Sequence, residues 1–182
     1  KLIGMTALAM SALLTACGGG GGSAGSSALP YSISLRADKT QLPLNISNEI
    51  AGIGAYSPFT TTLYVDAREG NSPILGGTGI FGCNVAGGLG SGALYYLDGK
   101  DEHMVEVDDG KGGKIKVPGA YRSIVLDSNA GGNSFHFHAG NIAGTARITC
   151  AVTNPADQLV SSASVDIVVG AATGKPASVT VT

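Results

Sequence analysis

Two histidines separated by one residue are the first side chains in this sequence that could carry chemistry. His136 and His138 alternate with Phe135 and Phe137. Side chains two apart on a β-strand project from the same face, so the two imidazoles could share a metal ion. No third or fourth ligand is evident, and His103 cannot be placed near them. The alternation favours a strand whose phenylalanines fill the core and whose histidines face solvent, so no metal or other cofactor is expected.

Acidic residues gather around a glycine-rich segment in the middle of the chain. Carboxylate oxygens are the ligands that calcium prefers in extracellular modules. The group comprises Asp98, Asp101, Glu102, Asp108 and Asp109. Its spacing matches neither an EF-hand nor a nonapeptide calcium repeat. We therefore expect solvated carboxylates in turns rather than a metal site.

Other motifs of catalysis and nucleic-acid binding are missing. The sequence has no His-Glu-x-x-His motif and no phosphate-binding glycine loop ahead of a predicted helix. Its formal net charge is −2, and its few Lys and Arg residues are not clustered as phosphate binding would require. We therefore expect neither an enzyme nor a nucleic-acid-binding protein.

The thiol of Cys17 ends an apolar leader. Residues 2–14 follow Lys1 and are too short to span a hydrocarbon core, which takes about 20 helical residues, so they are typical of a signal peptide. Leu14-Thr-Ala-Cys17 resembles a bacterial lipobox, in which the peptide is cleaved before a cysteine that receives diacylglycerol. We therefore expect residues 1–16 to be removed and lipid on Cys17 to anchor the chain. Gly18, in place of Asp, resembles the pattern that sorts lipoproteins to the outer membrane.

A flexible tether and a single module are expected to follow. Residues 17–29 are rich in glycine and serine and bury nothing. The pattern Pro-x-Ser-aliphatic-hydroxyl-aliphatic at 30–35 recurs at 176–181, as in chains built from repeated modules. We expect a module over 30–170 and, over 171–182, a linker with the first strand of a truncated second module. Residue 1 is lysine and not methionine, so the sequence is expected to be a fragment at its front, and the repeated pattern at 176–181 indicates a fragment at its back as well.

The module itself is predicted to consist of short strands. Glycine is abundant, at 29 residues, and β-branched runs are separated by Gly, Asn, Asp and Ser, with no helical period. Short turns without crossover helices indicate antiparallel sheets, and two sheets packed face to face bury the apolar faces best, so an all-β sandwich is expected. The expected strands cover residues 31–37, 60–67, 79–85, 93–97, 103–107, 114–117, 123–126, 134–139, 143–153 and 161–169.

Three stretches resemble one family. Residues 62–73, Thr-Leu-Tyr-Val-Asp-Ala-Arg-Glu-Gly-Asn-Ser-Pro, are similar to a strand and "D-x-x-G-N-P" turn of bacterial immunoglobulin-like domains of the invasin and intimin type, with Ser72 interrupting the usual order. Residues 138–152 are similar to the family's "A-G-x-x-A-G-T-A-x-I-x-A" strand pair, and residues 164–169 to its closing strand. The resemblance implies an immunoglobulin-like antiparallel β-sandwich. Residues 89–121 depart from the pattern and are predicted to hold an added hairpin.

The resemblance also places the two remaining cysteines. It lays Cys83 on the strand after the turn and Cys150 on a neighbouring strand, which implies a structural disulfide. Export would supply the oxidising compartment that such a bond needs.

Together these features predict a lipid-anchored protein of the cell envelope, at the outer membrane and facing either the periplasm or the surface. Its module would be a structural or adhesive spacer with a protein or glycan ligand, joined to further immunoglobulin-like modules. Two alternatives stay open. The chain could bind a glycan or small ligand through the 89–121 insertion, with Tyr95, Tyr96 and Tyr121 as stacking or hydrogen-bonding groups, or it could be the stalk of an enzyme encoded downstream.

Overall fold

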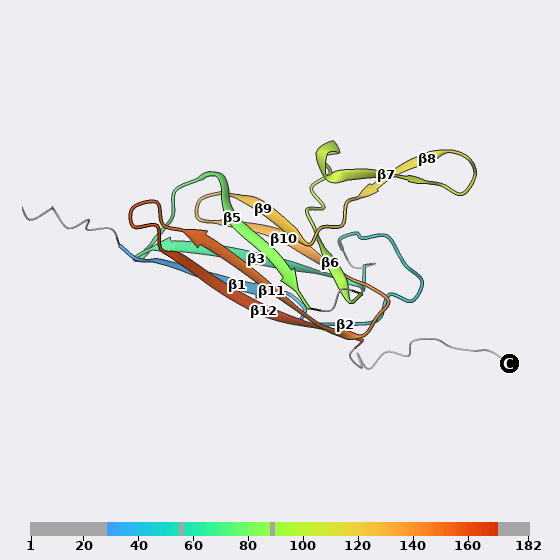
Figure 1. The fold of residues 1–182 in the computed structure, drawn as a ribbon, viewed down its shortest axis with the longest axis horizontal. Helices are drawn as coiled ribbons and strands as arrows, with labels where there is room; N and C mark the ends of the chain where they lie inside the picture. Colours follow the sequence, from blue (N-terminus) through green and yellow to red (C-terminus); the bar gives the residue numbers. More distant parts are fainter. Residues whose placement is uncertain (1–28, 55–56, 88–89, 171–182) are drawn as a thin grey trace, which may run out of the picture.

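The computed structural model describes residues 29–54, 57–87 and 90–170 (Figure 1). The predictions for the lipobox with Cys17, the tether over 17–28 and the second-module strand at 176–181 lie outside the described residues. The described chain forms two β-sheets packed face to face, with a separate hairpin beside them. The predicted all-β sandwich is confirmed.

The first sheet is centred on β3, which pairs with β1 on one side and β10 on the other. Leu63, Val65 and Ala67 of β3 are buried in the core. Asp66, between Val65 and Ala67, is exposed, as the two-residue period of a strand requires. In spatial order the strands are β1 (Tyr31–Ala37), β3 (Thr60–Glu69), β10 (Gly132–Ala139) and β6 (Gly92–Tyr95), with the short β4 (Ser72–Pro73) paired to β3.

The second sheet is centred on β11, which pairs with β12 and β5. Among the described residues, every pair of strands is antiparallel except β2 with β12, which is parallel. In spatial order the strands are β2 (Gln41–Leu42), β12 (Val160–Val169), β11 (Gly144–Thr153), β5 (Gly77–Ala86) and β9 (Ser123–Ser128).

This strand order is immunoglobulin-like. β1, β3 and β10 take the places of strands A, B and E in one sheet, and β5, β11 and β12 those of C, F and G in the other. β9 lies beside β5, as strand C′ does. β6 takes the place of strand D but precedes β9 in the chain, so it is an addition that the 89–121 insertion supplies.

The core lies between the two sheets and includes the disulfide. Phe81, Phe135 and Phe137 are fully buried there. Cys83 and Cys150 stand directly opposite each other on β5 and β11 and form the implied disulfide. The bond therefore joins neighbouring strands of one sheet, whereas antibody domains join their two sheets between strands B and F.

The insertion leaves the sandwich after β6. It continues through the short 3₁₀ helix η1 (Asp101–His103) into a hairpin of β7 (Met104–Asp108) and β8 (Lys114–Pro118), which projects away from both sheets (Figure 1). β6 approaches β10 so closely that a side chain at Gly92 would collide with the His138 carbonyl oxygen and the Phe137 ring. The hairpin predicted within residues 89–121 is present.

One prediction about the faces of a strand is wrong. His136 and His138 were expected on a solvent-exposed face, but they are only 9% and 6% exposed. They do lie opposite the inward-facing Phe135 and Phe137, so the alternation holds. The error arises because residues 43–54, between β2 and β3, fold across the outer face of this sheet, where Asn45 and Glu49 contact His138.

Candidate binding site in the 89–121 insertion

A sharp turn after β6 brings the insertion back over the edge of the sandwich. Leu97 has φ of 50°, in the left-handed region that costs a residue with a side chain about 1–2 kcal/mol. This turn ends the strand that sequence predicted to continue to Leu97. It also reverses the chain so that His103 meets the ring of Tyr96.

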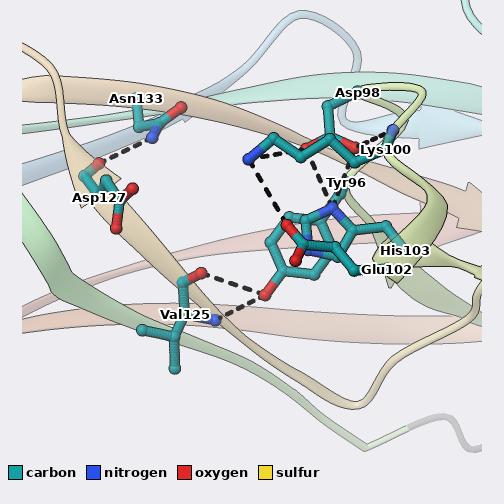
Figure 2. A network of polar contacts seen from close by, with 8 residues as sticks. All are labelled: Tyr96, Asp98, Lys100, Glu102, His103, Val125, Asp127 and Asn133. Atoms are coloured by element: carbon teal, nitrogen blue, oxygen red, sulfur yellow. Dashed lines mark hydrogen bonds and ion pairs between the residues drawn. The ribbon is translucent and has the colours of Figure 1, made fainter.

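Tyr96 fixes the insertion to strand β9. The Tyr96 hydroxyl donates to the Val125 carbonyl oxygen at 3.1 Å and accepts the Val125 N–H at 3.1 Å (Figure 2). In the β5–β9 ladder Val125 lies between hydrogen-bonded pairs, so these main-chain groups point to the free edge of the sheet. Unpaired strand edges promote aggregation. By bonding to Val125, the Tyr96 hydroxyl prevents another strand from pairing at this point of the β9 edge.

Aromatic contacts hold Tyr96 in this position. The His103 ring stacks on it with centroids 3.6 Å apart, and Tyr121 meets it edge-on at 5.4 Å. The Tyr96 ring and its hydroxyl therefore both make contacts within the chain.

Asp98 is the polar centre of the same site. Its carboxylate lies 2.9 Å from His103 Nδ1 and accepts the Lys100 main-chain N–H at 3.2 Å. Burial alone would raise the pKa of Asp98, but the hydrogen bonds and the charges of His103 and Lys100 outweigh it and lower that pKa below its usual value. Asp98 is therefore a carboxylate at neutral pH that orients His103 over Tyr96.

Beside this cluster is a shallow cavity of about 230 Å³. One wall carries Lys100 and Glu102, which lie 3.6 Å apart and are well exposed. The opposite wall carries Asp127 of β9 and Asn133 of β10, joined by a hydrogen bond of 2.7 Å from the Asn133 amide to the Asp127 carbonyl oxygen (Figure 2). Charges of both signs and an amide around a small hollow can bind a polar ligand.

The structure separates the three tyrosines that the sequence grouped. Tyr96 lines the cavity and packs against Tyr121, whereas Tyr95 lies apart from them and meets the His138 ring at 5.8 Å. Burial raises the pKa of Tyr95. A ligand-binding role for these tyrosines stays a prediction.

Sequence reasoning missed the polar network around His138. Its Nε2 lies 2.8 Å from the Glu49 carbonyl oxygen and its Nδ1 2.8 Å from the Thr60 hydroxyl. A neutral ring protonated at Nε2 donates to the first and accepts from the second. Burial lowers the pKa of His138, and it lowers that of His136 as well. His138 and its partners Glu49 and Thr60 come from separate segments, and no local pattern in the sequence indicates their contact.

The acidic residues do not converge on one point. Asp98, Asp101 and Glu102 lie around η1, while Asp108 and Asp109 bind main-chain N–H groups in the hairpin turn. Within residues 29–54, 57–87 and 90–170, no three His, Cys, Asp or Glu side chains are grouped as metal ligands.

Comparisons with known proteins add little. No family model matches the sequence, and no curated protein matches it. Among solved structures, the chain is similar to the crystal structure of BslA, a bacterial hydrophobin, at 15% sequence identity and a TM-score of 0.30. The match covers 76% of this chain and 95% of that chain. A likeness this weak does not indicate a shared activity, and the invasin and intimin resemblance stays a prediction.

Two further findings concern location. The Cys83–Cys150 disulfide is typical of proteins outside the reducing cytoplasm. In the part of the chain that the structure describes, no helix is long and apolar enough to cross a membrane.

Proposed function

We propose that this chain is a non-catalytic module of the bacterial cell envelope, anchored at the outer membrane by lipid on Cys17 and displaying its 89–121 insertion to a macromolecular partner. The observation that carries the proposal is the placement of the hairpin. Figure 1 shows the blue segment that leads into β1 and the β7–β8 hairpin toward opposite ends of the long axis. A lipid at the start of the tether would leave the hairpin directed away from the membrane.

The sandwich suits such a role. A disulfide cross-links its core, and such bonds persist in an oxidising environment. Tyr96 occupies main-chain groups at the β9 edge, which opposes edge-to-edge pairing with other molecules. An immunoglobulin-like spacer of the invasin and intimin type, followed by further modules, agrees with the sequence resemblance. A protein or glycan on a surface is the partner that this class implies.

The anchor can be tested by replacing Cys17 with alanine. The full chain should incorporate an alkyne-tagged fatty acid and float with outer-membrane vesicles, whereas Cys17→Ala should lose both properties. Tyr96→Phe is the control and should keep both. Fatty-acid labelling that persists in Cys17→Ala would contradict the proposed anchor.

The orientation can be tested with trypsin. Lys111 lies at the exposed tip of the hairpin. If the hairpin is directed away from the membrane, trypsin should cleave there equally fast in free and liposome-bound protein. Slower cleavage of the bound form would place the hairpin against the lipid.

A second candidate function is recognition of a glycan or small polar ligand. The cavity between Lys100 and Asp127 favours it, because its volume of about 230 Å³ suits one sugar ring. Asp127→Ala should abolish saturation-transfer NMR signals from such a ligand, while Asp157→Ala on the distant β11–β12 turn should not.

A further inference from the structure

The β7–β8 hairpin is a sheet of two strands only. Within the described residues no third strand pairs with either of them. Isolated two-stranded hairpins are marginally stable in water, and a third strand stabilises them. The hairpin therefore has the geometry of an acceptor for an added strand.

The ladder between β7 and β8 determines which main-chain groups point outward. His103 with Gly119 and Asp109 with Gly113 are hydrogen-bonded pairs at its two ends. By alternation, Val105 and Val107 bond to β8. The N–H and C=O groups of Glu106 and Asp108 therefore project from the outer side of β7, which we name the β7 edge.

The two edges of the hairpin differ in how well they are protected. The outward positions of β8 are Lys114, Lys116 and Pro118. Proline offers no N–H, and lysines on an edge discourage further pairing. The β7 edge carries neither lysine nor proline, so it is the edge that a strand can join.

Charge is also divided between the two strands. Residues 98–109 hold six acidic residues against the single Lys100, whereas residues 110–118 hold three lysines and no acid. On one face of the hairpin Glu106 stands opposite Lys116, and Asp108 opposite Lys114. A strand added beside β7 would place its side chains on this face next to Glu106 and Asp108, which favours basic residues.

The other face of the hairpin is apolar. Val105, Val107 and Ile115 lie together on it and are 45%, 37% and 45% exposed. An added strand would cover this row with every second side chain, so aliphatic residues suit those positions.

We propose that the β7 edge binds an extended peptide segment that alternates aliphatic and basic residues, by addition of that segment as a third strand. This names the partner class for the display module proposed above and rests on that function. Main-chain bonds to Glu106 and Asp108 supply affinity, and the two faces of the hairpin supply specificity.

A second copy of this chain fits the edge less well. Pairing of two β7 edges about a two-fold axis sets acidic strand against acidic strand. Pairing of β7 with β8 of the next copy would advance each copy by about 10 Å, which is the distance between the two packed sheets alone and leaves no room for the sandwich bodies.

The test uses the full chain and a short fluorescein-labelled peptide of alternating lysine and valine, with binding followed by fluorescence polarisation. Glu106→Pro removes one outward N–H and one carboxylate while sparing the β7–β8 ladder. Lys116→Pro is the matched control, because it removes an outward N–H from the other edge. We expect Glu106→Pro to weaken binding by about tenfold or more and Lys116→Pro to change it by less than about threefold. Glu106→Gln, which keeps the N–H, should fall between them.

Equal weakening by the two prolines, or equal affinity for a peptide of alternating glutamate and valine, overturns the proposal. So does self-association of the chain that Glu106→Pro abolishes while the peptide fails to bind. Circular dichroism of each variant should match the parent chain. The failure of this proposal is distinguishable from failure of the proposed function, because Cys17 labelling and membrane flotation do not depend on the β7 edge.

Discussion

Two pairs of antiparallel strands in this molecule have opposite surroundings. The β5–β11 pair has Cys83 and Cys150 facing a core that buries both completely, and further strands lie on each side. The β7–β8 pair has no neighbouring strand in the described chain, and its apolar residues Val105, Val107 and Ile115 are partly in solvent. The same secondary structure thus provides stability in the first pair and an accessible edge in the second.

The difference shows how a sandwich can carry a projecting hairpin that its buried core does not depend on. Tyr96 and η1 attach the insertion at the β9 edge, and the hairpin beyond them contributes nothing to the buried core. Changes in the first pair should therefore unfold the protein, while changes in the second should alter binding only. The predictions below test this separation.

The largest effect is expected from removal of the disulfide. Replacing both Cys83 and Cys150 with alanine opens a loop of 67 residues and should lower the free energy of unfolding by about 4 kcal/mol. Urea denaturation under oxidising conditions measures the change. A loss below about 1 kcal/mol would show that the core does not depend on the bond.

A matched pair of isoleucines compares the two strand pairs directly. Ile148→Ala on β11 leaves a cavity in a fully buried site and should cost about 3 kcal/mol. Ile115→Ala on β8 should cost less than about 0.5 kcal/mol, because the side chain is exposed. Similar losses in both variants would mean that the hairpin is part of the cooperative unit.

The covered histidines should make the sandwich sensitive to acid. Burial lowers the pKa of His136 and His138, so the unfolded chain binds more protons than the folded chain once pH falls below the ordinary histidine value of about 6.5. The free energy of unfolding should therefore be highest above that pH. It should decline as pH falls below it, and the decline should stop once pH is below the lowered pKa values of the folded state. Denaturation at a series of pH values should show a shallower decline in His138→Gln than in the parent chain.

A small effect is also expected where the insertion attaches. Tyr96→Phe removes the two hydrogen bonds to Val125 and should cost about 1 kcal/mol or less. Hydrogen exchange of the Val125 amide should accelerate. An unchanged rate would indicate that η1 and Asp98 shield this edge without the Tyr96 hydroxyl.

Much of this architecture could be predicted from sequence because strand alternation and turn residues are local properties. The first strand, at 31–37, has the bounds that were predicted, and the hairpin of β7 and β8 lies where the insertion departs from the family pattern. The short β2 and β4 were missed, since two residues carry no period. Residues 68–73 were expected as a turn only, yet Ser72 and Pro73 pair back against β3.

The candidate site was harder to predict because it depends on contacts between distant segments. Tyr96 and Val125 are far apart in the chain, and only the reversal at Leu97 brings His103 onto Tyr96. The cover over His138 comes from Asn45 and Glu49, in a segment without strand pattern. Residues 135–138 themselves contain no pattern that indicates this cover.

Hydrogen exchange followed by mass spectrometry, with and without the lysine–valine peptide, tests the central claim most directly. In the free chain the amides of β5 and β11 should exchange only through global unfolding, and those of Glu106 and Asp108 should exchange rapidly. The peptide should slow Glu106 and Asp108 while leaving the outward amides of β8 and the whole of β11 unchanged. Protection of Glu106 and Asp108 in the free chain, or slowing spread equally over β7, β8 and β11, would contradict a stable sandwich that displays an open strand edge.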